Sequence, residues 1–479
     1  LYYKDRNVSY VARGAYSYSD RYFFTASMRR DYASRLPRGK KYGDFPSVTA
    51  AWKITSEPWF KKNNVVSMLK LRASWGKIGN LGSIGYGYGV ATLSTRYPND
   101  SPDVGSQIGI NNRVMAGIFL ANAFNPNLTW ETSEQVDDAV LFNNRLNLSV
   151  DFFNKNTKNL IKTQDVNWPT TIGIASPLIN DGQVNNRGLE ISALWKDRIG
   201  KDIGYYVSAN VATLRNRLTN IGAANPDGSK PVWTYEDDYH YKELTPYRSS
   251  EGKPLYSYYL LRTDGVFQTD AEAAAYVNSN GQRLQPKAKA GDLKFVDIDQ
   301  NGSIGEGDYE FRGNAMPKMT YAFSAGFSYK KFSFDFMLQG SYGAKLFNAY
   351  KYTTLNEAVG SFNRSEKILK ALEGPTYDVP RISMTDDNDN FGRISDWYLE
   401  SGSYLRMKNI SISYSFSDLL RKLAFFNQRQ STLDLTLSCD NLFTITPYSG
   451  IDPEVGGVGL DCGQYPVSRT ISLGVKIKF

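Results

Sequence analysis

One twelve-residue stretch, 297–308, carries oxygen-bearing side chains at the spacing that a divalent cation requires. It matches the calcium-loop pattern D-x-[DN]-x-[DN]-G, in which the glycine permits a sharp turn. Ca²⁺ takes about six to eight oxygen ligands, from carboxylates, amides and main-chain carbonyls. The last position holds Asp instead of the longer Glu, so an acidic turn without metal stays open as the alternative. The predicted ligands are Asp297, Asp299, Asn301, Ser303 through its carbonyl, and Asp308.

Aromatic residues outside the regular segments are the candidates for contact with a ligand. Their flat faces can stack on sugar rings, but long loops also need small cores of their own, so both roles are open for each residue. Aromatic residues at segment ends, such as Trp52 and Trp75, are instead typical of a girdle at a membrane interface. The tentative substrate-binding residues are Trp168, Trp233, Tyr235, Tyr239, Tyr241 and Trp397.

Few residues offer other chemistry. Cys439 and Cys462 lack CxxC spacing, and a disulfide between them or two free thiols are both open. His240 is the only histidine, which disfavours a His-based metal or nucleophile site. No nucleophile elbow, Walker loop or zinc spacing occurs. The net charge of +8 includes no Lys/Arg block, which disfavours nucleic-acid binding. We therefore predict that the chain is not an enzyme.

Alternation of apolar and polar residues is the dominant pattern in the chain. Near the C-terminus Ile471, Leu473, Val475 and Ile477 alternate with polar or small residues. Period 2 over about ten residues is typical of membrane barrels, in which every second side chain meets lipid. Thirteen such strands are predicted, at 9–18, 21–31, 45–55, 67–77, 130–143, 145–155, 187–197, 203–214, 318–330, 331–341, 403–417, 431–441 and 470–479.

The composition agrees with a barrel. Aromatic residues make up 14% of the chain, and 40 glycines suit turns and bulges. The mean hydropathy of −0.44 is low for a membrane protein, but lumen-facing residues and loops of a barrel are polar. No run of about 18 apolar residues occurs, so a transmembrane helix is not expected.

The connections between the predicted strands alternate in length. Those after odd-numbered strands are short, as at 198–202, and those after even-numbered strands are long, with 215–317 and 342–402 the largest. Outer-membrane barrels have short periplasmic turns and long extracellular loops. The odd strand count, with an inward first strand, indicates that strands and a plug of a barrel of roughly 22 strands lie upstream. We predict that 1–479 is the C-terminal part of a large, plugged, all-β transmembrane antiparallel barrel, without its plug and N-terminal domain.

Short motifs spread in order over nearly the whole chain. They are DRYFFTAS at 20–27, LRASWG at 71–76, NPNLTWE at 125–131, NRGLE at 186–190, GDLKF at 291–295, LRMKNI at 405–410, NLFT at 441–444 and GQYP at 463–466. Each motif is weak alone, but together and in this order they are specific. Through them the chain resembles the SusC/RagA family of TonB-dependent outer-membrane transporters of Bacteroidetes-type bacteria.

The resemblance implies active import of an oligomeric nutrient, a glycan or a peptide, across the outer membrane. A SusD-like lipoprotein would cap the barrel, and TonB–ExbB–ExbD would act through the plug that these residues lack. Phe479 would be the recognition signal for the barrel-assembly machinery, or a plain lipid contact. The alternatives are a passive porin or siderophore-type receptor without a lid, a structural or adhesin barrel, and a soluble all-β glycan-binding enzyme.

Overall fold

Thirteen antiparallel strands follow one another in chain order in the main sheet of the computed structural model. The structure describes residues 5–61, 66–82, 84–85, 93–94, 107–110, 113–116, 119–120, 123–143, 145–163, 177–222, 230–234, 239–360, 362–416 and 432–478. The strands are β1 (Asn7–Tyr18), β2 (Tyr22–Ala33), β3 (Tyr42–Lys53), β4 (Met68–Asn80), β9 (Glu131–Asn143), β10 (Leu146–Lys158), β13 (Gln183–Ile199), β14 (Ile203–Thr213), β22 (Met319–Tyr329), β23 (Phe332–Tyr342), β26 (Tyr404–Ser415), β27 (Thr432–Asp440) and β30 (Thr470–Lys478).

Each of these strands corresponds to one predicted from alternation, so the predicted all-β architecture is confirmed. The tight hairpin at Lys330-Lys331 is also present, because Tyr329 pairs with Phe332. Lys330 adopts φ 52°, the left-handed conformation that a two-residue hairpin loop demands. Since consecutive strands run antiparallel, the long connections after β2, β4, β10, β14, β23 and β27 all leave the sheet at the same end. No helix among the described residues is long and apolar enough to cross a membrane.

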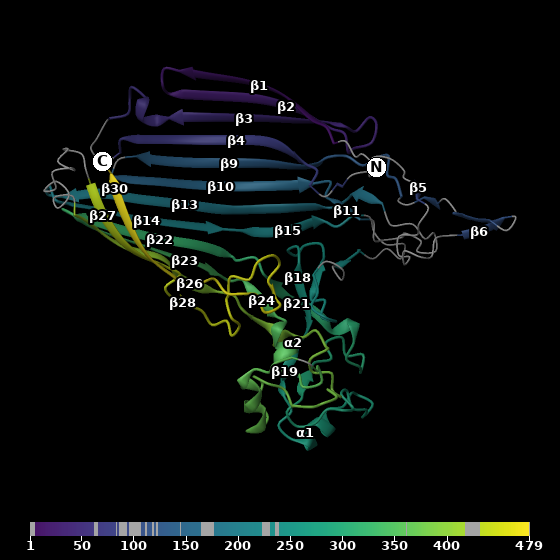
Figure 1. Cartoon of the computed structure of the whole chain (residues 1–479). Coiled ribbons are helices and arrows are strands. Elements are labelled where there is room, and N and C mark those ends of the chain that lie inside the picture. Colours follow the sequence, from purple (N-terminus) through teal and green to yellow (C-terminus); the bar gives the residue numbers. More distant parts are fainter. Residues whose placement is uncertain are drawn as a thin grey trace. The chain divides into compact units, whose positions relative to one another are not determined.

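The chain divides into two compact units, and the first holds the N-terminal strands. Unit 1 comprises Leu1–Ala193, Arg215–Trp233 and Ser250–Lys253, with β1 to β10 drawn purple to blue in Figure 1. A small apolar cluster forms where its strands meet the long connections. There the rings of Phe45 and Trp130 lie 5.3 Å apart, edge to face. A side chain at Gly79 would stand 2.1 Å from the Phe45 ring, so only glycine fits beneath this pair.

Unit 1 also contains shorter secondary-structure elements. They are η1 (Ile54–Ser56), β5 (Leu93–Ser94), β6 (Gln107–Ile110), β7 (Arg113–Ala116), β8 (Phe119–Leu120), β11 (Ile161–Thr163), β12 (Leu178–Asn180) and β15 (Arg215–Asn220). β11 pairs with β12. β15 follows β14 in the chain and also pairs with β13. Apart from η1, which follows β3 in a short connection, these elements lie in or beside the long connections, which are therefore structured beyond what alternation predicts.

Unit 2 holds the C-terminal strands, and one face of this sheet is apolar and open. It comprises Leu194–Leu214, Thr234–Ser249 and Pro254–Phe479. In β30 the exposed fractions are 71% for Ile471, 68% for Leu473 and 61% for Val475. Leu473 faces Leu437, and Leu437 faces Ile412, so the apolar row continues across three strands. An open apolar face of this extent needs a nonpolar surrounding, as lipid provides.

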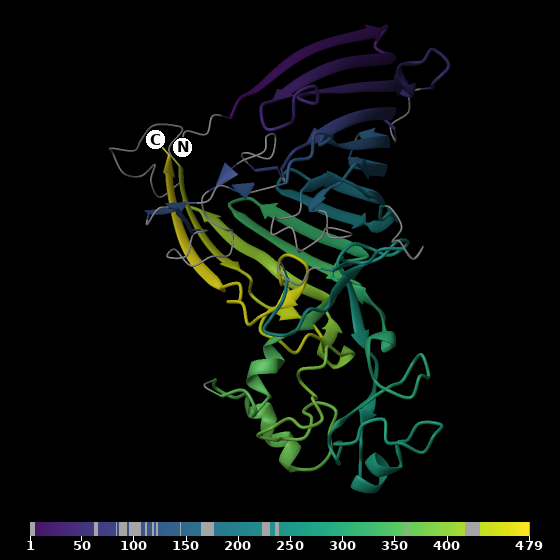
Figure 2. The same ribbon diagram turned by 90° about the vertical axis from the view of Figure 1, so that its right-hand side faces the viewer.

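The long connections of unit 2 fold into a structured module with a core of its own. We name the described residues of 239–249, 254–317, 343–402 and 441–469 the loop module. Figures 1 and 2 both show its teal and green segments gathered beyond the ends of β22, β23 and β26. Its elements are β17 (Tyr247–Ser249), β18 (Ser257–Leu261), β19 (Thr263–Val266), α1 (Asp270–Ala275), β20 (Leu293–Phe295), η3 (Glu306–Asp308), β21 (Tyr309–Asn314), β24 (Lys345–Asn348), α2 (Tyr350–Thr354), η4 (Glu366–Leu372), η5 (Asp396–Tyr398), β25 (Leu399–Ser401), β28 (Thr444–Ile445) and β29 (Leu460–Asp461).

An aromatic column joins the two largest connections at the centre of the loop module. The ring centroids of Tyr258 and Phe347 lie 6.2 Å apart, and those of Phe347 and Tyr398 lie 5.0 Å apart. All three side chains are fully buried. The Tyr258 hydroxyl donates to the carbonyl of Val458, 3.1 Å away, in the connection before β30. The column thus holds residues from three parts of the chain in one core.

Candidate functional site

The predicted calcium loop brings its three carboxylates together. One carboxylate oxygen from each of Asp297, Asp299 and Asp308 lies within 4.8 Å of the others. Gly302 adopts φ 88°, as the predicted sharp turn requires, and its amide donates to Asp297 at 2.9 Å. Asn301 accepts from the Ser303 amide at 2.9 Å, which continues the turn.

The hydrogen-bond inventory of this loop fits a cation. Asp308 is fully buried and accepts from the amides of Ile298 at 2.6 Å and Gly305 at 2.7 Å, which fix its carboxylate. Asp297 keeps its Oδ1 atom buried without any hydrogen-bond partner among the described residues. A buried carboxylate oxygen without a donor is costly, and a cation beside it removes that cost. The residues present therefore fit the ion that the loop pattern predicts.

The predicted substrate-binding role stays a prediction for the two described tryptophans, although both rings are largely enclosed. Trp397 is 3% exposed and Trp233 is 8% exposed, so neither offers a free ring face. Lys351 covers the Trp397 ring at 4.7 Å, and Lys162 covers the Trp233 ring at 4.4 Å. Both rings pack within the fold, and Trp397 also lines the pocket described below.

The other tentative substrate-binding residues do not form one cluster of exposed rings. Tyr239 is half-buried, 5.3 Å from the ring of Tyr256, and Tyr241 lies 6.5 Å from the ring of Tyr352. These contacts belong to the edge of the module's core. Trp168 and Tyr235 lie outside the described residues, as does Phe479, so their roles stay predictions.

Cys439 and Cys462 are free thiols in the structure, which agrees with the second of the two alternatives for them. Cys439 lies in β27 opposite Ile471. Cys462 is half-buried in the connection before β30, and burial raises the pKa of its thiol. The raised pKa makes the Cys462 thiol less activated as a nucleophile.

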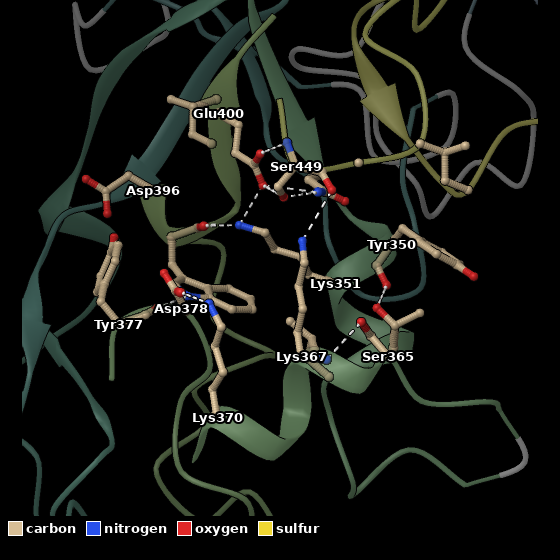
Figure 3. Close-up of a pocket in the computed structure, with 17 residues that line it drawn as sticks. Tyr350, Lys351, Ser365, Lys367, Lys370, Tyr377, Asp378, Asp396, Glu400 and Ser449 are labelled. Atoms are coloured by element: carbon tan, nitrogen blue, oxygen red, sulfur yellow. Dashed lines mark hydrogen bonds and ion pairs between the residues drawn. The ribbon is translucent and has the colours of Figure 1, made fainter. Parts of the chain in front are cut away.

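A pocket of about 580 Å³ in the loop module was not predicted from the sequence. Figure 3 shows that Lys351 of α2 and Lys367 and Lys370 of η4 extend into it. Tyr377 and Tyr350 lie on opposite sides in this view. Its size is that of a small-molecule site, for which pockets of about 300–1,000 Å³ are usual. No motif signals it, because its walls come from residues about a hundred positions apart, from Asn348 to Ile451.

A buried ion pair forms the inner wall of this pocket. The Nζ atom of Lys351 lies 2.8 Å from a Glu400 carboxylate oxygen and donates to the Trp397 carbonyl at 2.9 Å. Burial alone would raise the pKa of Glu400, but Lys351 and the donors of Ser449 outweigh it, so this pKa lies below its ordinary value. Burial lowers the pKa of Lys351, and Glu400 opposes that shift. The pair fixes the wall because each charge is compensated.

The fold and these sites define a class of protein: a membrane-barrel wall that carries a structured loop module with a ligand-sized pocket. A family model described as TonB dependent receptor-like, beta-barrel, matches residues 2–442. The chain belongs to this family of TonB-dependent receptors, which are outer-membrane proteins and not enzymes.

Individual relatives agree with this assignment. The chain is 30% identical to TonB-dependent receptor P3 of Formosa agariphila, over 98% of this chain and 45% of that protein. It is 26% identical to TonB-dependent receptor SusC of Bacteroides thetaiotaomicron, over 100% of this chain and 44% of that protein. Among solved structures, the RagAB peptide transporter matches 99% of this chain and 48% of its own, with 24% identity and a TM-score of 0.76. The resemblance to SusC and RagA is thus confirmed, and the chain spans about half the length of these relatives.

Proposed function

We propose that this chain belongs to a TonB-dependent importer of an oligomeric nutrient, a glycan or a peptide. The observation that carries the proposal is the similarity to SusC, which extends over the whole chain, loops included. The ordered loop module supports it, because a transporter that must recognise its cargo needs fixed side chains where the cargo arrives. A passive pore has no such need.

The importer would act with a SusD-like lipoprotein over the loop module and with TonB–ExbB–ExbD at the periplasmic side. The module's apolar core makes it a firm platform for such a lid. Binding, closure of the lid and displacement of a plug would move the nutrient inward, without a bond being made or broken. The barrel-assembly machinery would insert the strands into the outer membrane.

A purification from the native host tests this proposal. The full-length protein, tagged and extracted in mild detergent, should retain a surface lipoprotein in near-equal amount. Deletion of the host's TonB should abolish uptake of the nutrient while the barrel is still present in the membrane. Uptake that persists without TonB would contradict the proposal and favour a passive porin. TonB-dependent uptake without a lipoprotein would favour a siderophore-type receptor.

We also propose that the 297–308 loop binds Ca²⁺ as a structural ion. Asp297, Asp299 and Asp308 would supply carboxylate oxygens, Asn301 its amide oxygen and Ser303 its carbonyl. The ion would hold the loop against the segment that follows α1, in which Asn278 already donates to the Gly302 carbonyl at 3.1 Å.

Hydrogen exchange with and without chelator tests the ion. Removal of Ca²⁺ should raise exchange in 292–312 and leave β22 unchanged. Asp297→Asn should abolish the response to chelator, whereas Asp264→Asn, which alters an exposed carboxylate outside the loop, should preserve it. Exchange that does not respond to chelator in the unchanged protein would refute the site.

A further inference from the structure

The pocket lined by Lys351, Lys367 and Lys370 has an uneven balance of donors and acceptors. Its carboxylates are already engaged. Glu400 accepts from Lys351 and from the Ser449 amide at 2.7 Å. Asp396 is paired with Arg312 at 2.6 Å and accepts from the Thr263 hydroxyl at 2.6 Å. Asp378, the third lining carboxylate, is 61% exposed and pairs with Lys370, so it is the carboxylate that still faces the pocket.

The ammonium groups, in contrast, keep donors to spare. Lys370 makes one ion pair, with Asp378 at 2.6 Å. Lys367 donates to the neutral carbonyl of Ser449 at 3.3 Å and has no ion pair with a described carboxylate. An ammonium carries three donors, so both groups can bind further acceptors. The pocket thus calls for an acceptor-rich ligand group.

The geometry of η4 directs these two lysines to the same place. Side chains at i and i+3 eclipse one another on a 3₁₀ helix, so Lys367 and Lys370 project from one side of Glu366–Leu372. Figure 3 shows both side chains reaching into the pocket from below. Asp378 compensates the charge of Lys370, whereas Lys367 has no described carboxylate partner, so an anionic ligand group beside the two lysines would balance the remaining charge.

The remaining walls suit a sugar better than a peptide. Tyr350 and Tyr377 are 37% and 42% exposed, which leaves ring surface for a pyranose. Ser365 and Ser449 add side-chain hydroxyls to the lining. The strand at the pocket, β25, has three residues, which is too short an edge to register an added peptide strand.

We propose that this pocket binds an acidic sugar of the imported oligomer, with its carboxylate or sulfate group between Lys367 and Lys370. The inference rests on the proposed import function and names the chemistry of the cargo. The carboxylate and sulfate forms share the charge and the acceptor oxygens that the two ammonium groups require. Binding should weaken as salt is raised, because both lysines are exposed.

Calorimetry on the full-length protein tests this inference with four probes. They are tetragalacturonate, a sulfated chondroitin tetrasaccharide, neutral maltotetraose and a tetraglutamate peptide. At least one acidic tetrasaccharide should bind, and more tightly than maltotetraose. Lys367→Glu combined with Lys370→Glu should weaken that binding by about tenfold or more, since charged hydrogen bonds are lost. Lys367→Arg combined with Lys370→Arg should retain it.

Lys287→Glu combined with Lys289→Glu is the matched control, with the same charge change on exposed lysines of unit 2 outside the pocket. It should leave the affinity unchanged. The inference is overturned if neither acidic tetrasaccharide binds, if the two charge reversals weaken binding equally, or if only tetraglutamate or maltotetraose binds. TonB-dependent uptake and lipoprotein co-purification that persist in that case would leave the proposed import function standing, so the two failures are distinguishable.

Discussion

The strands of unit 2 and the loop module that they carry are stabilised in different ways. In β30 every second side chain is apolar and open, with Leu473 68% exposed. The loop module instead encloses a core of large apolar side chains, in which Phe347 is 0% exposed. The strands therefore depend on the solvent around them, which is lipid, whereas the module depends on its own packing.

Replacing one phenylalanine by alanine in each region should give the largest difference in lost stability between the loop module and the strands. Phe347→Ala empties the centre of the aromatic column and should cost the module about 3–5 kcal/mol. Phe323→Ala, on the open face of β22, should cost about 1 kcal/mol or less, because lipid fills the space that the ring leaves. Thermal unfolding followed by tryptophan fluorescence and by heat-modified gel migration measures the two losses. Equal losses would mean that the open face is packed against protein.

A charge placed on the open face should give the next largest effect. Leu473→Arg should destabilise the barrel in lipid by about 2–4 kcal/mol if its position lies near the bilayer centre. The matched change Ser472→Arg places the same charge on the opposite face of β30 and should be tolerated. The folded fraction of each variant in liposomes, read from gel migration without heating, measures the difference. If both variants fold equally well, the apolar face of β30 does not meet lipid.

Loss of one buried arginine should affect only the last connection. Arg406 is 2% exposed and lies 2.6 Å from carboxylate oxygens of both Asp452 and Glu454. Arg406→Ala should cost about 2–3 kcal/mol, less than a fully buried pair, because both carboxylates keep some contact with water. Hydrogen exchange should rise in 443–469. Arg393→Ala, which removes an exposed pair at 3.8 Å, is the control and should leave exchange there unchanged.

Lowering the pH should give the smallest of these effects, a local loss of stability in the loop module. Because the folded pKa of Glu400 lies below the ordinary value of 4.5, its ion pair contributes stability that is fully present above that pH. The contribution is lost as the pH falls from 4.5 through the folded pKa. Exchange in α2 and β25 should therefore rise below pH 4.5, and Glu400→Gln should remove this dependence. If stability increases as the pH falls below 4.5, the assigned direction of the pH dependence is wrong.

The two regions also differ in how far the sequence predicts them. Alternation predicts the last strand and its open face from Ile471, Leu473 and Val475, because a pattern over ten residues is a local signal. The pattern of the predicted calcium loop is equally local, and its three carboxylates lie close together as the spacing predicts. Trp397 is predicted from its position in a long connection and does line the lysine pocket, but its packing against Phe391 and Tyr398 has no signal in the sequence. The lysine pocket has no local signal, since α2, η4 and 449–451 meet only in the folded module.

The aromatic column sets an order of events during biogenesis. Tyr258 precedes the hairpin of β22 and β23, whereas Phe347 and Tyr398 follow it. The core therefore cannot close while the chain is exported only as far as residue 346. Until then Tyr258 and its neighbours are exposed on an incomplete surface, where long-range contacts are slow to form and aggregation competes. Completion of the module therefore requires segments from both sides of the β22–β23 hairpin.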